Sequence, residues 1–243
     1  MEPKIAVIFR SYAKTPDNLQ EMLDRAHKSA VAAFNCGCVP YFCIPIDYDC
    51  GKTKDFFKKG FLKFKDISQP DILECPGYHS SGALNKAIAV IQKSGDYTHV
   101  AIVSNKASGY LVPETIKAIT DAINTGAKVV GVIVDEIICE SRIQNTFAVW
   151  DIEALMTLDI PGFDNETGIE EIAPIVRLIR KYGPCIAVLN PTVGKLNIRT
   201  DGKDRHHEVI TTKQERQEIE VKRVNTDFDF IQKGIMKGYP KKI

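Results

Sequence analysis

The chain has 243 residues and a mass of 27.1 kDa, with 44% hydrophobic and 26% charged residues. This is the composition of an ordinary soluble globule, and it excludes a disordered, collagen-like or coiled-coil protein as the main description. The formal net charge of +1 excludes a strongly basic nucleic-acid binder, so no nucleic-acid partner is expected.

Strand-like apolar runs alternate with helix-like periodic segments through the first half of the chain, which is typical of an α/β sheet. The expected strands are Ile5–Phe9, Val39–Ile46, His99–Val103 and Lys128–Val134. Helices are expected after the N-cap and first-turn pair Thr15-Pro16, after the turn-rich stretch 76–82, and from Pro113. The basic, aromatic segment Asp55–Lys65 is expected to form a short helix or ordered loop, and Ser104–Tyr110 a polar loop.

The second half has weaker patterning. We expect a strand at Thr146–Val149, a short helix at Glu153–Leu158 and a strand at Cys185–Leu189. A helix is expected after Glu170, in which Pro174 fits only the first turn. Beyond residue 191 the periodicity weakens and the charge rises, as in a solvated extension.

The cysteines and the N-terminus indicate a cytoplasmic protein. The seven cysteines are odd in number, lie mostly in apolar stretches and lack zinc-ligand spacing, which is typical of reduced thiols. The N-terminus has no apolar core of a signal peptide, and no apolar run approaches the ~18 residues that span a membrane. Any membrane contact is therefore expected to be peripheral.

Polar residues follow three of the expected strands. The first strand leads into Arg10-Ser11-Tyr12-Ala13, the second into Asp47-Tyr48-Asp49, and the strand at 99–103 into Ser104-Asn105-Lys106. In an open α/β sheet the ligand binds outside the carboxyl ends of the strands, where these residues would lie. Two further segments are distinctive. The first is Gly82-Ala83-Leu84-Asn85, at the entry to a helix. The second is residues 161–183, which contain a Pro-Gly-Phe-Asp turn, then the pair Glu170-Glu171, then Arg177-Leu178 and finally Gly183.

In their order and spacing these five segments resemble a family 2 glycosyltransferase of the GT-A fold, over roughly residues 4 to 192. The resemblance implies an α/β, GT-A-like nucleotide-binding sheet flanked by helices. It divides residues 1–194 into a nucleotide-binding half (1–135) and an acceptor half (136–194), followed by a charged C-terminal extension (195–243).

The resemblance also implies roles for individual residues. The nucleotide-binding residues it indicates are Tyr12, Ser11, Asp47 with Asp49 as the alternative, Asn85, Ser104, Asn105 and Lys106. The second acid of the Glu170-Glu171 pair, Glu171, takes the place of the base that deprotonates the acceptor hydroxyl, where the family usually has Asp.

The chain departs from the family where an Asp-x-Asp pair would bind a divalent cation. Ser104, Asn105 and Lys106 stand there instead, and Ser and Asn are weak ligands for Mg²⁺ or Mn²⁺. Either Lys106 replaces the cation as a fixed positive charge on the leaving diphosphate, or metal binding and catalysis have been lost. Substitute metal ligands at Asp135 and Glu136, and a diphosphate contact from His206 or His207, are weaker alternatives.

The leading hypothesis is transfer of a sugar, with inversion, from a UDP- or GDP-linked donor to a glycan or other hydroxyl acceptor. The alternative is an inactive GT-A-like protein that binds a nucleotide or glycan or serves as an interaction module, and the oligomeric state stays open. A nucleotidyltransferase fits less well because the first strand is not followed by a glycine-rich Arg-Lys loop, and a dehydrogenase because no GxGxxG follows it.

Overall fold

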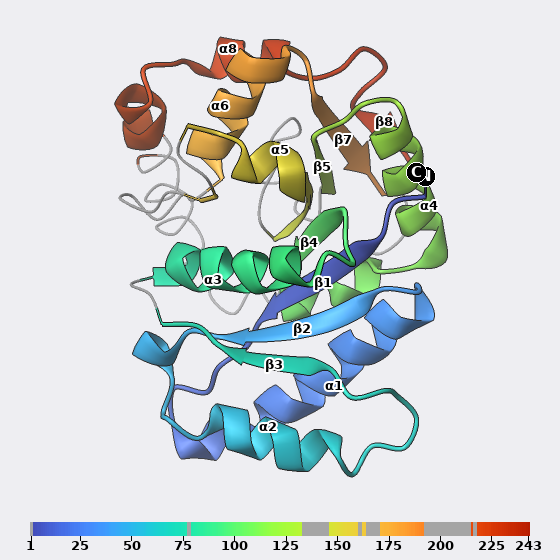
Figure 1. The fold of residues 1–243 in the computed structure, drawn as a ribbon, viewed down its shortest axis with the longest axis vertical. Helices are drawn as coiled ribbons and strands as arrows, with labels where there is room; N and C mark the ends of the chain where they lie inside the picture. The colour runs from blue at the N-terminus through green and yellow to red at the C-terminus, as the bar shows by residue number, and fades with distance from the viewer. Residues whose placement is uncertain are drawn as a thin grey trace, which may run out of the picture.

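One eight-stranded sheet runs through the computed structural model, with helices packed on both of its faces (Figure 1). The structure describes residues 2–76, 79–132, 146–159, 162–163, 171–191, 215 and 218–243, and for residues 79 and 80 it describes the backbone alone. The strands are β1 Ile5–Arg10, β2 Val39–Ile44, β3 Asp71–Glu74, β4 His99–Val103, β5 Val129–Val132, β6 Phe147–Asp151, β7 Ile186–Asn190 and β8 Lys241–Lys242. The α-helices are α1 Leu19–Asn35, α2 Thr53–Phe61, α3 His79–Ser94, α4 Pro113–Asn124, α5 Ile152–Met156, α6 Ile172–Tyr182 and α8 Phe228–Lys233, and the 3₁₀ helices are η1 Pro16–Asn18, η2 Ile46–Tyr48 and η3 Asn105–Tyr110.

The strand order is β3-β2-β1-β4-β6-β5-β7-β8, and only β6 runs antiparallel to its neighbours. The other strands therefore all end at the same edge of the sheet, which we call the carboxyl edge. The chain moves outward from β1 through β2 to β3 and then returns to β4 on the other side of β1. Such a reversal of strand order is where open α/β sheets bind their ligands.

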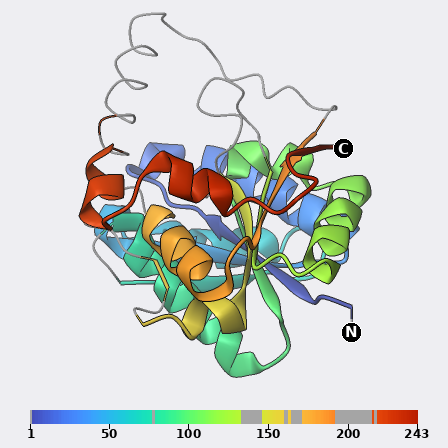
Figure 2. The same ribbon diagram turned by 90° about the horizontal axis from the view of Figure 1, so that it is seen from above.

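Both faces of the sheet are buried at its centre, so the central strands are largely continuous apolar runs. Successive side chains point to opposite faces: Ala6 and Ile8 pack in the cluster formed with α3, α5 and α6, whereas Val7 and Phe9 pack in the cluster formed with α1, α2 and α4. The view from above shows α6 and α4 on opposite sides of the sheet (Figure 2). The sheet is thus the middle layer of three.

Four helices begin at the carboxyl edge. Short turns join the ends of α1, α3, α4 and α6 to the starts of β2, β4, β5 and β7. Each helix therefore runs antiparallel to the strand that follows it, and its N-terminus lies beside the carboxyl ends of the strands. Residues early in these helices, which include Asn85 and Glu171, are brought to the same edge as the loops that follow β1, β2 and β4.

The expected strands and helices are confirmed, with differences at their ends. Thr15 occupies an N-cap position, but its side chain makes no capping hydrogen bond, and Pro16 begins η1 ahead of α1. The turn-rich stretch is shorter than expected because α3 begins at His79. The expected polar loop 104–110 is instead η3, capped by the Ser104 side chain, which accepts a hydrogen bond from the Ala107 N–H. Pro174 lies in the first turn of α6, as expected.

The C-terminal residues complete the sheet. Ile231 of α8 and Val221 are buried in the same cluster as α6, and β8 pairs in parallel with β7. Arg180 of α6 donates hydrogen bonds to the carbonyls of Val224 and Asn225, at 3.0 and 2.8 Å. Within the described part of the chain, no helix has both the length and the apolar character needed to cross a bilayer.

Candidate functional site

The loops that follow β1 and β2 are joined by hydrogen bonds at the carboxyl edge. The Asp49 carboxylate accepts from the backbone N–H groups of Ala13 (3.3 Å) and Gly51 (2.9 Å), and from the Thr53 hydroxyl. The Thr53 oxygen in turn accepts from the Ala13 N–H at 3.0 Å. Asp49 is therefore engaged in holding the two loops together at the start of α2.

Asn105 joins the end of β4 to β1 and α1. Its side-chain nitrogen donates to the Ser11 hydroxyl at 2.7 Å and to the Arg10 carbonyl at 3.3 Å, and its side-chain oxygen accepts from the Ser29 hydroxyl at 2.9 Å. Ser11 and Ser29 are fully buried. The structure thus brings Ser11 and Asn105 together, as expected for residues of one site, and it uses their polar atoms in bonds within the protein.

Two tyrosines lie side by side at this edge. The rings of Tyr12, after β1, and Tyr48, after β2, have centroids 6.0 Å apart and planes inclined by 43°. Tyr48 is 37% exposed and Tyr12 is half-buried. Asp47, in η2 beside Tyr48, is exposed. Aromatic faces open to solvent offer a stacking surface for another ring.

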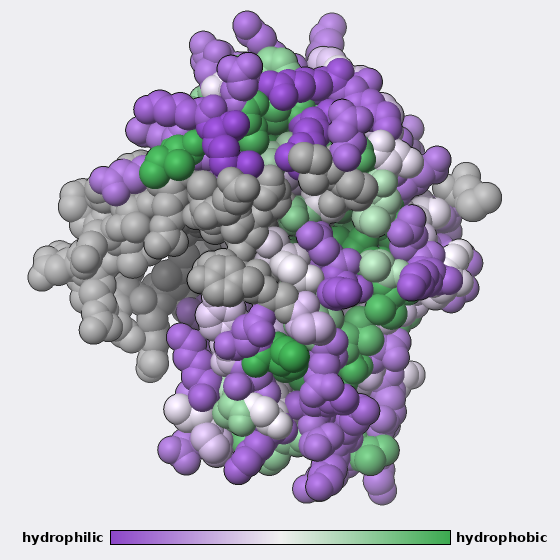
Figure 3. Space-filling model, turned by 60° about the vertical axis from the view of Figure 1, so that its left-hand side comes forward, coloured by the Kyte–Doolittle hydropathy of each residue, from purple (hydrophilic) through white to green (hydrophobic). Residues whose placement is uncertain are grey.

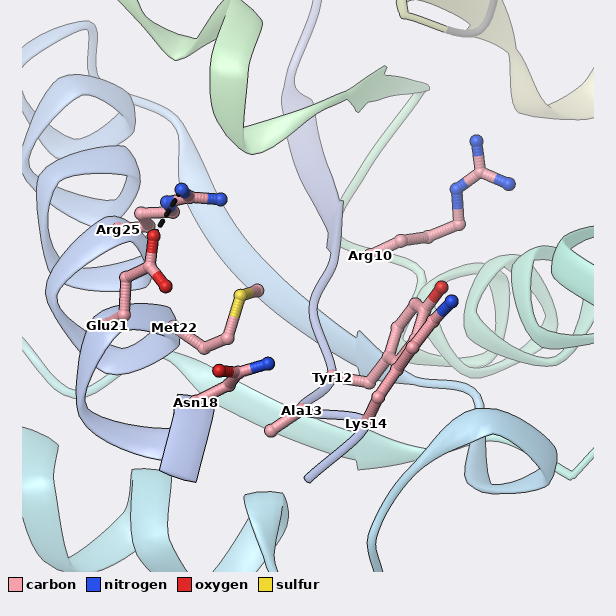
Figure 4. Close-up of a pocket in the computed structure, with 8 residues that line it drawn as sticks. All are labelled: Arg10, Tyr12, Ala13, Lys14, Asn18, Glu21, Met22 and Arg25. Carbon is pink, nitrogen blue, oxygen red and sulfur yellow. Dashed lines mark hydrogen bonds and ion pairs between the residues drawn. The ribbon is translucent and has the colours of Figure 1, made fainter. Parts of the chain in front are cut away.

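An open pocket of about 300 Å³ separates the loop after β1 from the first turns of α1 (Figure 4). It is lined by Arg10, Tyr12, Ala13, Lys14, Asn18, Glu21, Met22 and Arg25. Three of these side chains are basic, and Glu21, the one acidic member, pairs with Arg25. Figure 4 shows Arg10 extending away from the α1 residues, so its guanidinium lies apart from the Glu21–Arg25 pair.

Arg10 was expected at the carboxyl edge, but the family resemblance indicated no nucleotide-binding role for it. It is the last residue of β1, is half-buried, and pairs in register with Cys43 of β2. The hydrogen bond that the Cys43 thiol donates to Cys75, together with burial, raises the pKa of Cys43, and the positive charge of Arg10 opposes that rise. The sequence feature that could have indicated its role is a cationic residue directly at the end of a buried strand.

Asn85 joins two of the segments that carried the family resemblance. Its side-chain nitrogen donates to the Phe163 carbonyl and its oxygen accepts from the Phe163 N–H, both at 2.8 Å. The preceding residue, Gly162, has a φ of +80°, and a Cβ there would lie 2.4 Å from the Asn85 oxygen. The ring of Phe163 packs edge-on against Trp150, with centroids 4.8 Å apart. Asn85 therefore fixes the turn between α5 and α6.

The remaining candidates differ in their surroundings. Glu171 precedes α6 and is buried, with an exposure of 6%, and its side chain makes no capping hydrogen bond. Lys106 is exposed in η3, and Ser104 caps that helix. Glu170, Asp135, Glu136, His206 and His207 lie outside the described residues.

The described residues at the end of β4 do not fit a divalent cation. The Ser104 hydroxyl accepts from Ala107, the Asn105 oxygen accepts from Ser29, and the next residue, Lys106, is positively charged. Mg²⁺ and Mn²⁺ prefer several free carboxylate, carbonyl or water oxygens. Nowhere in the described part of the chain do three or more His, Cys, Asp or Glu side chains form a group that suits a metal ion.

Comparison with solved structures defines the class of fold. The mannosyltransferase PcManGT from Pyrobaculum calidifontis, in complex with GDP-Man and Mn²⁺, is similar with a TM-score of 0.58 and 12% sequence identity, over 96% of this chain and 68% of that one. Mannosyl-3-phosphoglycerate synthase from Rubrobacter xylanophilus is similar with a TM-score of 0.53 and 10% identity, over 91% of this chain and 75% of that one. The chain therefore has a glycosyltransferase-like α/β fold of the GT-A type, which confirms the expected fold class. No protein-family model and no curated protein sequence matches it.

Proposed function

We propose that this protein transfers a sugar from a GDP- or UDP-linked donor to an acceptor hydroxyl. The observation that carries the proposal is that Arg10 and Tyr12 line one pocket at the end of β1, at the reversal of strand order in a GT-A-like sheet. The two structures with a similar fold support it, since one is a mannosyltransferase in complex with GDP-Man and the other a mannosyl-3-phosphoglycerate synthase.

In this proposal the two tyrosines receive the base and the cations receive the diphosphate. Tyr12 and Tyr48 stack on the base, and Asp47 accepts hydrogen bonds from the base or ribose. Negative charge grows on the diphosphate as the bond to the sugar breaks, so a fixed cation nearby accelerates the reaction. We assign this role to Arg10, with Lys106 as a second cation from the end of β4, and we propose that no metal ion is needed.

Glu171 is the proposed base. It lies at the start of α6, which begins at the carboxyl edge and packs on the sheet face to which Ala6, Ile8 and, by alternation along β1, Arg10 point. The acceptor oxygen forms a bond to the anomeric carbon as the bond from that carbon to the diphosphate breaks on the opposite side, and the acceptor proton passes to the Glu171 carboxylate. This displacement inverts the anomeric configuration.

Calorimetric titration with GDP and UDP, each with and without Mn²⁺ or Mg²⁺, tests the proposal. We expect metal-independent binding that Arg10→Ala weakens by at least about tenfold, because a hydrogen bond to a charged group contributes about 1.5–3 kcal/mol. Lys93→Ala, which removes an exposed lysine at the far end of α3, is the matched control. Metal-dependent binding would contradict the metal-independent mechanism and favour Asp135 and Glu136 as metal ligands. Failure of the folded protein to bind either nucleotide would overturn the proposal.

A second candidate function is a non-catalytic nucleotide- or glycan-binding module of the same fold. It is favoured by the observation that Asp49, Asn85 and Asn105 use their polar side-chain atoms in bonds within the protein. Glu171→Gln separates the two functions. In a transferase this substitution preserves nucleotide binding and lowers the rate of sugar transfer by about 10²–10⁴-fold. In a binding module, neither the wild type nor the Glu171→Gln variant transfers sugar.

A further inference from the structure

The outer side of α2 and the turn that follows it carry an unbalanced positive charge. Residues 52–65 contain six lysines and a single acidic residue, Asp55, in a chain whose net charge is only +1. Lys58, Lys59, Lys63 and Lys65 are all exposed, and Leu62 stands among them. We call these five residues the α2 lysine surface. The proposed sugar transfer makes no use of it.

The opposite side of α2 is firmly packed. Phe57 and Phe61 are buried against Phe42 of β2, with ring centroids 6.0 and 5.3 Å from it. After the helix, the ring of Phe64 stacks on His27 of α1 at 3.7 Å. The backbone of the α2 lysine surface is thus held in place on both sides of Leu62.

Leu62 is unusually open to solvent for an apolar residue. Its exposure of 68% is the highest among the large apolar side chains of the described residues. Its N–H donates to the carbonyl of Lys58 at 3.4 Å, so the two residues lie one turn apart on the same side of the helix. Leu62 is therefore an exposed apolar side chain that lies among exposed lysines.

The lysines of this surface are not neutralised by neighbours. Lys54, nearer the start of α2, pairs with Glu74, and Asp66 pairs with His27 at 3.2 Å. Within the described part of the chain, Lys58, Lys59, Lys63 and Lys65 have no acidic partner. Lysines in the last helical turn stabilise the helix dipole, which accounts for Lys58 and Lys59, whereas Lys63 and Lys65 lie beyond the helix end.

We propose that the α2 lysine surface binds the anionic surface of a lipid bilayer. Clustered lysines are attracted to anionic headgroups, and an exposed apolar side chain among them can enter the boundary between headgroups and acyl chains. The exposed Leu62 favours a bilayer over a nucleic acid, which offers phosphates but no apolar layer. In Figure 1, α2 forms the lower end of the molecule, and that end is largely hydrophilic with few apolar side chains in Figure 3.

Binding at this surface leaves the carboxyl edge accessible. Asp49 and Thr53 hold the start of α2 at that edge, and Leu62 follows its other end. At about 1.5 Å per helical residue, Lys58 and Lys59 stand about 8–9 Å along α2 from Thr53, and the last residue of the helix stands about 12 Å from it, with Lys63 and Lys65 beyond that end. A docked protein would thus keep its nucleotide-binding loops free of the membrane.

Co-sedimentation with vesicles tests the proposal on the full chain. We expect binding to phosphatidylcholine vesicles that contain phosphatidylglycerol, no binding to phosphatidylcholine alone, and weaker binding as salt is added, because salt screens the attraction. The triple variant Lys58→Glu, Lys59→Glu, Lys63→Glu should bind at least about a hundredfold less tightly, since each lysine near an anionic membrane is worth roughly a fivefold change. Leu62→Ser should weaken binding without removing its dependence on salt.

The matched control reverses three exposed lysines elsewhere, Lys93, Lys117 and Lys237, for the same change in net charge. It should bind as the wild type does, and circular dichroism checks that all variants fold. Equal binding by the wild type and the α2 variant would overturn the proposal, as would absence of wild-type binding. Binding to a DNA duplex without binding to anionic vesicles would also overturn it, and would assign the surface to a nucleic acid.

Discussion

At the residue scale, Asn85 gives a sharp test because two roles can be separated. The family resemblance gives it a nucleotide contact, and the structure gives it two hydrogen bonds to the backbone of Phe163. We expect Asn85→Ala to lower the free energy of unfolding by about 2 kcal/mol, because it leaves a buried N–H and carbonyl without partners. Urea denaturation measures this loss. Unchanged stability with weakened GDP or UDP binding would show that the nucleotide role dominates.

Gly162 is coupled to Asn85 and provides a second readout. Gly162→Ala combines a left-handed backbone with a clash against the Asn85 oxygen, and we expect it to destabilise the protein by about 2 kcal/mol or more. Gly37→Ala is the matched control, because Gly37 has a positive φ of +69° and no atom within 4 Å of a Cβ. The clash accounts for the difference between the two. In the Asn85→Ala background that difference should shrink, and if it does not, the contact is not its cause.

His99 makes stability depend on pH. It is 7% exposed at the start of β4, its Nδ1 lies 2.8 Å from the Thr98 hydroxyl, and its Nε2 has no partner among the described residues. Burial lowers the pKa of His99; the nearby Asp151 opposes this, and Lys128, which pairs with Asp151 at 2.8 Å, adds to it. The folded protein therefore holds His99 neutral at pH values where the unfolded chain, with a pKa near about 6.5, is protonated.

The sign of the effect follows from that difference. Between about pH 6.5 and the lower pKa of the folded state, the unfolded chain binds more protons, so the free energy of unfolding falls as pH falls, by up to about 1.4 kcal/mol per pH unit. Thermal or urea unfolding at a series of pH values measures the slope. His99→Leu should flatten it across this window, and a variant with the wild-type slope would place the pH dependence elsewhere.

At the element scale, α1 and α2 approach each other closely at Gly60. A Cβ on Gly60 would lie 2.3 Å from a methyl carbon of Leu23, which is buried in α1. Alanine favours the helix by about 1 kcal/mol, whereas overpacking costs about 1–3 kcal/mol, so we expect Gly60→Ala to destabilise on balance. The control is Gly109→Ala, where a Cβ has no neighbour within 4 Å. Equal unfolding midpoints for the two variants would contradict the close approach.

The elements that the sequence could predict are those with a long, regular pattern. Helices α1, α3, α4 and α6 repeat apolar residues at helical spacing, and β1, β4 and β7 are apolar runs bounded by turns. Strand β3 was missed because it has four residues and is exposed at both ends, and β8 because its two residues are lysines. Such short edge strands form because the backbone of a neighbouring strand is available for hydrogen bonding. The pattern of apolar residues in the sequence does not reveal that neighbour.

In the candidate site, too, some features could be predicted from the sequence and others could not. A polar residue at the end of a strand predicts a place at the carboxyl edge, and Ser11, Tyr12 and Asn105 do lie there. The sequence does not reveal whether an amide is already bonded within the fold, because that depends on the distant partners Ser29 and Phe163. A role for Arg10 was missed because its place beside Cys43 follows from the register of β1 on β2, which the sequence does not reveal.

At the scale of the whole molecule, the C-terminal residues close the edge of the sheet. The N–H of Met236 donates to the carbonyl of Ile186 at 2.8 Å, and that of Ile243 to the carbonyl of Asn190 at 3.0 Å. The segment thus meets β7 at its first residue, where Ile235 bridges Ile186, and at its last two residues, where β8 pairs with Leu189 and Asn190. An uncovered, apolar β7 would be an open template for pairing with another chain.

Deletion of residues 235–243 should therefore change the state of association. We expect the truncated chain to form species larger than those of the full chain as concentration rises, measured by size-exclusion chromatography with light scattering, and the amides of β7 to lose protection from hydrogen exchange. The double variant Lys241→Ala, Lys242→Ala is the control, because it keeps the backbone pairing and removes only exposed side chains. A truncated chain with the mass of the full chain and with protected β7 amides would show that the edge is closed by something other than this segment.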